Sequence, residues 1–81
     1  MKVTARFFAS FREITGKGAE DFEINDVSTV GSFTEIIVGK YPALKNHMNH
    51  ISVAVNSEYA RPVEKLHDGD EVAFLPPISG G

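Results

Sequence analysis

The residue types best suited to chemistry stand together at the C-terminal end of the chain. The last residues are Leu75, Pro76, Pro77, Ile78, Ser79, Gly80 and Gly81, with no charged side chain among them. The two prolines have no amide hydrogen to donate to a sheet, so they end the last strand and project the following residues outward. The two glycines carry no Cβ and can pass through a slot too narrow for other residues. The sequence therefore predicts an extended arm, residues 76–81, that presents the Gly81 carboxylate to a partner protein.

An arm of this kind needs a separate docking surface, because ordering it costs conformational entropy. Fixing the backbone of residues 78–81 costs roughly 4 to 8 kcal/mol, at about 1 to 2 kcal/mol per residue. Strand parity puts Phe8, Ala54 and Leu75 on the sheet face that points away from the expected core, with Tyr59 in a turn nearby. These four side chains predict an apolar docking patch beside the root of the arm. The alternative is that the two terminal glycines are a frayed end without function.

The hydrophobic pattern predicts the elements that must position the arm and the patch. The expected strands are residues 1–10, 20–24, 51–56 and 72–75, with residues 63–66 as a short strand or an extended link. Between them, apolar residues at helical spacing predict an amphipathic helix over residues 30–41, with Thr29 as its N-cap and Pro42 after its end. One helical turn is expected at residues 11–14, and residues 44–49 are expected to be irregular.

One helix and four or five short strands can bury their apolar faces only if the helix lies across a single sheet. We therefore expect an α+β domain over residues 1–75, with the first and last strands central and parallel, as in the β-grasp fold. The expected core consists of Val3, Phe7, Phe33, Ile37, Val53, Val55, Val72 and Phe74.

Composition and motif spacing exclude several functions. The net charge of -3 disfavours a nucleic-acid partner, and the absence of cysteine excludes disulfides, thiolate metal sites and a cysteine nucleophile. His47 and His50 have a spacing that could serve a metal, but no further ligand completes a site, so we expect solvated histidines. No apolar run is long enough to span a membrane. We expect no bound metal, no membrane partner and a cytoplasmic location.

The chain resembles the small subunit of molybdopterin synthase, the MoaD family of ubiquitin-like sulfur carriers, over its full length. The resemblance is strongest in residues 68–81, which read DGDEVAFLPPISGG. Further matching positions are Phe7, Phe8, Ala9, Arg12, Glu13, Thr29, Val30, Tyr41, Pro42, Ala54, Val55 and Asn56. The chain departs from the family at Gly31 and Gly39, where better helix formers are usual, and at Leu75, where some members carry Phe.

The resemblance implies a carrier that is not catalytic alone and binds no cofactor of its own. An E1-like adenylating enzyme would use ATP to adenylate the Gly81 carboxylate, which is then converted to a thiocarboxylate. The carrier would join the large molybdopterin synthase subunit in a heterotetramer and donate sulfur to cyclic pyranopterin monophosphate. The residues agree with this role. Because Phe11 and Gly18 stand where a P-loop around Lys17 needs other residues, ATP chemistry must come from a partner.

Three alternative functions remain open from the sequence. The chain could be a ubiquitin-like modifier, joined through Gly81 to lysines of target proteins, because that chemistry begins with the same adenylate. It could be a ThiS-like carrier that supplies sulfur for the thiamin thiazole, although such carriers are typically shorter and lack the two prolines. It could also be an interaction domain with an inert tail.

Overall fold

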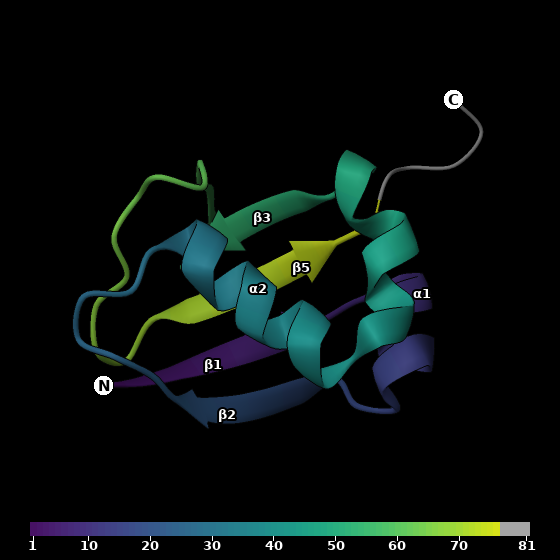
Figure 1. Ribbon diagram of the computed structural model, residues 1–81, viewed down its shortest axis with the longest axis horizontal. Helices are drawn as coiled ribbons and strands as arrows, with labels where there is room; N and C mark the ends of the chain where they lie inside the picture. The colour runs from purple at the N-terminus through teal and green to yellow at the C-terminus, as the bar shows by residue number, and fades with distance from the viewer. Residues whose placement is uncertain (77–81) are drawn as a thin grey trace.

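The computed structural model describes residues 1–76, with the side chains of residues 48–50 excepted, and the remainder of the predicted arm lies outside the described residues. The helices are α1 (Ala9–Thr15), α2 (Val30–Lys40) and the 3-10 helix η1 (Pro42–His50). The strands are β1 (Lys2–Phe7), β2 (Ala19–Glu23), β3 (Ser52–Val55), β4 (Glu58–Tyr59) and β5 (Glu71–Leu75). Figure 1 shows α2 lying across one face of the sheet.

The strands form one five-stranded mixed sheet in the order β2-β1-β5-β3-β4. Strand β1 pairs antiparallel with β2 and parallel with β5, and β5 pairs antiparallel with β3. The first and last strands are therefore central and parallel, which confirms the expected α+β architecture and the β-grasp topology. The first strand, β1, and the last strand, β5, are neighbours inside the sheet. Strand β5, which leads into the arm, is therefore hydrogen-bonded on both sides, to β1 and to β3.

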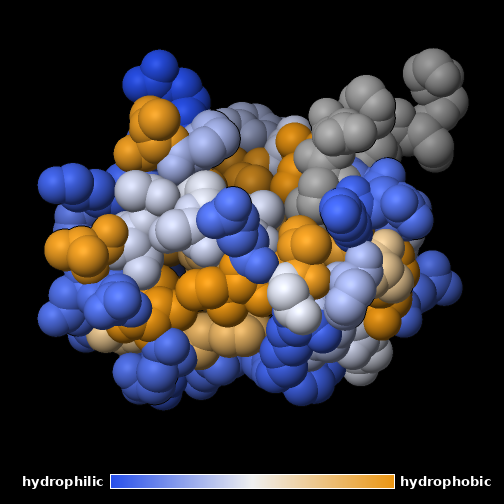
Figure 2. Space-filling model, in the orientation of Figure 1, coloured by the Kyte–Doolittle hydropathy of each residue, from blue (hydrophilic) through white to orange (hydrophobic). Residues whose placement is uncertain are grey.

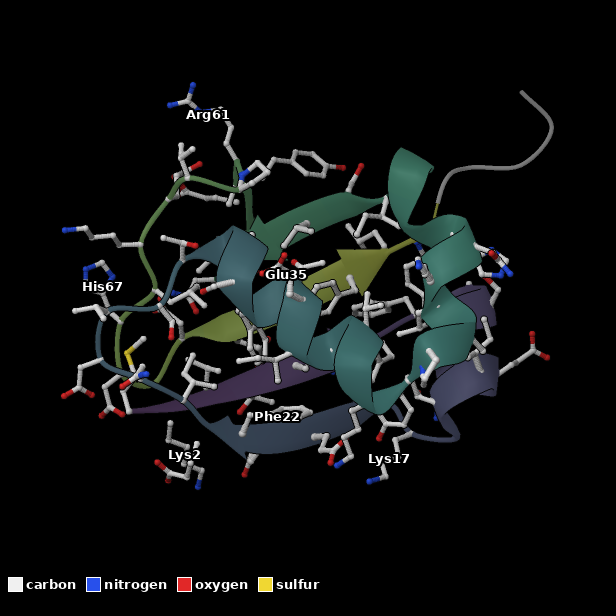
Figure 3. All side chains as sticks on the ribbon, viewed as in Figure 1. Lys2, Lys17, Phe22, Glu35, Arg61 and His67 are labelled. Carbon is white, nitrogen blue, oxygen red and sulfur yellow. The ribbon has the colours of Figure 1, made fainter. Side chains whose placement is uncertain are left out.

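The core lies between the sheet and α2, and its aromatic side chains are in mutual contact. The Phe7 ring stacks on Phe74 with centroids 6.0 Å apart, and Phe33 of α2 lies 5.9 Å from Phe74. Phe22 of β2 points toward α2, where its ring meets Phe33 edge-on at 5.5 Å (Figure 3). Of the expected core, only Val53 and Val55 of β3 are half-buried rather than buried.

Five wholly buried residues lie outside the expected core: Ala5, Phe11, Val30, Leu44 and Leu66. The segment that contains Leu44 was expected to be irregular, but it forms η1. The helical turn around Phe11 is longer than expected, since α1 runs to Thr15 and ends at Gly16 with a φ of 76°. Leu66 belongs to the extended link, because residues 63–66 form no strand and pair with the rest only through the Thr29–Lys65 bridge.

The α2 helix begins where the sequence predicts, and its first turn is closed by a capping box. The Thr29 hydroxyl accepts from the Ser32 amide at 3.2 Å, and the Ser32 hydroxyl accepts from the Thr29 amide at 2.9 Å. This arrangement satisfies two backbone donors that would otherwise be unpaired at the helix start. The cap fixes the end of α2 from which Val30 and Phe33 enter the core.

Candidate functional site

The root of the arm is the C-terminal end of β5. Leu75 is the last residue of that strand and lies opposite Ser52 of β3, while the preceding Phe74 pairs with Phe7 of β1. The chain therefore reaches Pro76 from the centre of one end of the sheet rather than from its edge (Figure 1). The remaining predicted arm residues, Pro77, Ile78, Ser79, Gly80 and Gly81, lie outside the described residues.

The predicted docking residues come from four elements, and strand pairing brings them to one face. Ala54 of β3 lies opposite Tyr59 of β4 on one side and Ala73 of β5 on the other. Leu75 is two residues beyond Ala73 and shares its face, because side chains alternate along a strand. Phe8 follows the last residue of β1 in an extended conformation, and Leu75 follows Phe74, the partner of Phe7, so Phe8 and Leu75 lie next to each other at the same end of the sheet. We call the sheet face opposite α2, which these residues share, the outer face.

Exposure differs among the four docking residues. Tyr59 is 79% exposed and Phe8 is 39% exposed, while Leu75 is half-buried. Ala54 is only 7% exposed, so the expectation that it would present apolar surface was wrong. Its small side chain lies low between paired neighbours, and the patch consists mainly of Phe8, Leu75 and Tyr59. Tyr59 also lies in β4 rather than in a turn, since the turn is formed by Asn56 and Ser57 with φ values of 51° and 74°.

Charged residues of the outer face lie in β1, β2 and β5, and Arg6 is the one among them that borders the patch, with its guanidinium near the Phe8 ring. Arg6 pairs with Glu71 at 3.4 Å and Lys2 pairs with Asp21 at 3.4 Å. The Thr4 hydroxyl donates to Asp21 at 2.7 Å. This hydrogen bond, together with the Lys2 ammonium, holds the pKa of Asp21 below its usual range against the opposing effect of desolvation. The outer face therefore changes from apolar beside the root of the arm to charged at the opposite end of the sheet.

The acidic segment before β5 serves the fold. Asp70 is 9% exposed and accepts hydrogen bonds from the Asn56 amide group at 2.9 Å and the His67 backbone at 2.8 Å. Asp68 accepts from the Lys2 backbone at 2.7 Å. These bonds hold the turn before β5 and join it to β1 and to the hairpin of β3 and β4. Among the described side chains, which exclude those of residues 48–50 and 77–81, no group of three or more potential metal ligands is found.

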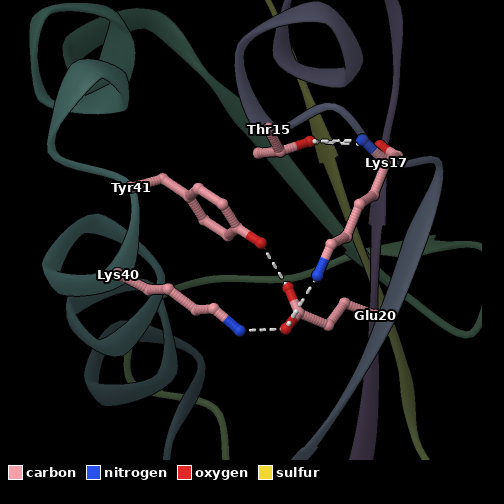
Figure 4. A network of polar contacts seen from close by, with 5 residues as sticks. All are labelled: Thr15, Lys17, Glu20, Lys40 and Tyr41. Carbon is pink, nitrogen blue, oxygen red and sulfur yellow. Dashed lines mark hydrogen bonds and ion pairs between the residues drawn. The ribbon is translucent and has the colours of Figure 1, made fainter.

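A second polar cluster, on the helix side, was not predicted as a unit. Glu20 of β2 forms ion pairs with Lys40 and Lys17, and its carboxylate accepts from the Tyr41 hydroxyl at 2.5 Å (Figure 4). The pKa of Glu20 lies below its ordinary value. Desolvation by partial burial acts to raise it, but the hydrogen bonds from Lys40, Tyr41 and Lys17 together outweigh this effect. Glu20 is two residues before Phe22 and therefore points to the same side of the sheet. This parity is the feature of the sequence from which a polar contact with the helix side could have been predicted. The cluster fastens the junction of α2 and η1 to β2.

The helix side also carries an apolar cavity of about 520 Å³ between the start of α2 and the strands β3 and β4. Its lining includes Val30, Thr34 and Ile51, together with Tyr59 of the edge strand β4, which therefore borders the helix side as well as the outer face. Around it, hydrophobic and hydrophilic atoms are interspersed over the helix side (Figure 2). The helices found in residues 1–76 are too short or too polar to cross a membrane.

Comparisons with known proteins agree with this geometry. The ThiS family model matches residues 5–81. The molybdopterin synthase sulfur carrier subunit of Chlamydomonas reinhardtii is 40% identical over 83 aligned residues that cover both chains completely. The crystal structure of SAMP1 from Haloferax volcanii matches with a TM-score of 0.90 and 31% identity, covering both chains completely. A chain of the Helicobacter pylori complex of subunits 1 and 2 of molybdopterin-converting factor matches with a TM-score of 0.71 and 27% identity, again over both full lengths.

Proposed function

The chain belongs to the ThiS family as a sulfur carrier of the MoaD type, and on this premise we propose that it is the small subunit of a molybdopterin synthase. The observation that carries the proposal is the position of β5. The strand that leads toward Gly81 is held in the centre of the sheet, and its last residue, Leu75, lies beside Phe8 on the outer face. A partner that binds this face also receives whatever follows Pro76.

The proposed chemistry takes place at the Gly81 carboxylate. A carboxylate is a poor electrophile because its negative charge repels nucleophiles. One of its oxygens attacks the α-phosphorus of ATP in the active site of an E1-like adenylating enzyme, and pyrophosphate leaves. A sulfur nucleophile then displaces AMP from the acyl carbon, which leaves a thiocarboxylate. Glycine at this position places no side chain beside the acyl carbon.

In the synthase, the thiocarboxylate sulfur replaces an oxygen substituent on a carbon of cyclic pyranopterin monophosphate, so that a C–O bond breaks as the C–S bond forms. Water then cleaves the bond between this sulfur and the acyl carbon of Gly81, which restores the carboxylate and leaves the sulfur on the product. Two such transfers supply the two sulfur atoms of the dithiolene. The large subunit provides the substrate pocket and the catalytic side chains, so the carrier contributes the sulfur and the docking face of a sulfurtransferase complex. ATP is consumed by the activating enzyme, and the carrier holds no cofactor.

The proposal is tested by loading the carrier with its activating enzyme, ATP and a sulfur donor, followed by intact-mass measurement. The full chain should gain the mass of one oxygen-to-sulfur exchange, located on Gly81. A variant without Gly81, and one extended by a single uncleavable residue, should show no gain and should support no molybdopterin formation with the large subunit. Full loading of either variant would overturn the proposal, provided that both keep the circular dichroism spectrum of the full chain.

Protein modification through Gly81 is the second candidate function, favoured by the likeness to SAMP1, a small archaeal modifier protein. Purification from native cells separates the two functions. A carrier is recovered as free protein and thiocarboxylate, whereas a modifier is recovered in conjugates of higher mass that contain isopeptide bonds. A ThiS-like role predicts instead that loss of the gene creates a requirement for the thiamin thiazole.

A further inference from the structure

Arg6 is a charged residue of the outer face that lies directly beside the apolar docking patch. Arg6 of β1 lies opposite Ala19 of β2 and Ala73 of β5, and Ala73 in turn lies opposite Ala54. Alanines on both sides are too short to cover a long side chain, and the Arg6 side chain is 45% exposed. Arg6, Ala73, Ala54 and Tyr59 therefore form one row across the strands. The guanidinium is at one end of this row, Tyr59 is at the other, and the two short alanine side chains lie between them.

The contacts of Arg6 connect it to the patch and leave most of its donors open. Its guanidinium carbon lies 6.0 Å from the centroid of the Phe8 ring, in reach of a cation–π interaction. One nitrogen donates to Glu71 at 3.4 Å, which is long for a charge-assisted hydrogen bond. A guanidinium has five N–H donors. Within residues 1–76 this bond to Glu71 is the single side-chain hydrogen bond recorded for Arg6, so the other donors are free to meet a partner.

Docking changes the surroundings of this group. A partner that covers Phe8 and Leu75 also removes water from the adjoining guanidinium, and a dehydrated cation is costly unless acceptors replace the lost water. The single long bond to Glu71 does not supply them. A purely apolar partner surface would therefore bind this face poorly, whereas a carboxylate can meet the planar guanidinium through two parallel hydrogen bonds.

We propose that Arg6 determines partner specificity, and that the large subunit places a carboxylate against its guanidinium beside the apolar contact with Phe8 and Leu75. The inference rests on the proposed function, because it names the chemistry of the partner at the same docking face. Lys2 provides a matched comparison. It lies on the same strand and face and is ion-paired at the same distance, but it is four residues farther from the patch.

The test measures association and dissociation of the large subunit of the same synthase with variants of the full carrier. For Arg6→Leu we expect at least about tenfold weaker binding, mostly through faster dissociation, as for a charge pair inside an interface. Arg6→Lys should be intermediate, because it keeps the charge but loses the two-pronged geometry. Lys2→Leu should change affinity by less than about twofold. Glu71→Gln should leave binding unchanged or tighter, since it removes the competing acceptor within the carrier.

Two results would overturn the inference. One is Arg6→Leu binding as tightly as the wild type; the other is Arg6→Leu and Lys2→Leu altering only the association rate to the same extent, as rim charges do. Leu75→Asp separates these outcomes from a failure of the proposed function. If Leu75→Asp abolishes binding and Arg6→Leu does not weaken it, the docking face is supported and the proposed role of Arg6 is wrong. If neither variant weakens binding, the docking face itself is wrong. Arg6→Gln replaces Arg6→Leu if the latter does not fold.

Discussion

Leu75 is the residue at which the strand, the patch and the arm meet. Its side chain is half-buried on the outer face, opposite Ser52, and does not belong to the core between the sheet and α2. We therefore expect Leu75→Asp to weaken binding of the large subunit by at least about tenfold, because a carboxylate would be buried against an apolar surface. Titration calorimetry would measure the loss.

The same substitution should change stability little. An aspartate at this position stays in contact with water in the free protein, so we expect a loss below about 1 kcal/mol in the free energy of unfolding. Ser57→Asp places the same charge in the exposed turn after β3, at the other end of that strand from Leu75, and serves as the control for a general charge effect. Undiminished affinity of Leu75→Asp would show that the large subunit binds elsewhere.

Glu20 gives the fold a defined response to acid. Its pKa in the folded protein lies below the ordinary value of 4.5, so the ionised carboxylate stabilises the folded state. This stabilisation is present in full above the unfolded pKa and is lost as the pH falls through the lower folded value. The pKa of Tyr41 is raised, first by its hydrogen bond to Glu20, so its contribution is present below the ordinary value of 10.0 and is lost at higher pH.

Urea unfolding between about pH 6 and pH 3 tests the role of Glu20. The free energy of unfolding of the wild type should fall as the pH decreases, and Glu20→Gln should show a shallower fall together with lower stability at neutral pH. Glu13→Gln, at an exposed position of α1, is the control and should follow the wild type. Parallel curves for Glu20→Gln and the wild type would mean that the ion pairs with Lys40 and Lys17 contribute nothing.

At the scale of single residues, the sequence predicted which face of the sheet a side chain points to better than it predicted which other side chains it contacts. Alternation placed Phe7, Val72 and Phe74 in the core and Leu75 on the outer face. Glu20 shares the parity of Phe22, but no role was predicted for it, because its partners Lys40 and Tyr41 lie 20 and 21 residues away at the end of a helix and the pattern does not fix where that end lies. The burial of Ala54 was missed because parity gives direction and not the size of the neighbouring side chains.

At the scale of elements, the start of α2 depends on local chemistry that the sequence contains. Removing the Thr29 hydroxyl breaks the capping box, so Thr29→Ala should destabilise the protein by about 1 kcal/mol. Thr34 is a control on the same helix, since its hydroxyl donates to the Val30 carbonyl without capping the helix. Thr34→Ala should be neutral or slightly stabilising, because alanine is the better helix former. Thermal unfolding would compare the two, and equal effects would contradict the capping role.

The segment after α2 shows why one element was missed. Its residues are mostly polar, and Pro42 correctly indicates the end of an α-helix. However, Tyr41, Leu44 and His47 recur every third residue, which is the period of a 3-10 helix. Leu44 is wholly buried, and the exposed His47 lies edge-on to Phe11 at 6.1 Å. A search for helical stripes at a spacing of 3.6 residues does not find a face of this kind. The His50 side chain of the His47–His50 pair lies outside the described residues.

At the scale of the whole molecule, the docking face exists only when the sheet is complete. Its residues come from β3, β4, β5 and the residue after β1, and β5 reaches its place only by pairing with strands from both halves of the chain. The central pairing of first and last strands could be predicted, because burying one helix on a short mixed sheet leaves few topologies. The change from apolar to charged side chains across the outer face could not be predicted, since it depends on the register of β1 with β2 and β5.

This arrangement separates the fold from the chemistry, and a truncated chain of residues 1–76 tests the separation. Among the described residues, the buried hydrophobic side chains lie between Val3 and Phe74, and all of these are kept in the truncated chain. We expect the melting temperature to stay within about 4 °C of the full chain, which corresponds to less than about 1 kcal/mol. The truncated chain should still occupy the large subunit through Phe8 and Leu75, and should therefore inhibit molybdopterin formation by loaded full-length carrier in competition.

The reciprocal fragment, a peptide of residues 71–81, carries the arm without the face. It should be loaded by the activating enzyme far more slowly than the full chain, because nothing offsets the entropy of ordering the arm. Efficient loading of the peptide would show that the arm alone is recognised, and loss of folding in the truncated chain would show that the arm contributes to the core. If both fragments behave as expected, a partner must bind the outer face of the folded sheet before it can reach the terminal carboxylate. Folding is then itself a condition for sulfur transfer.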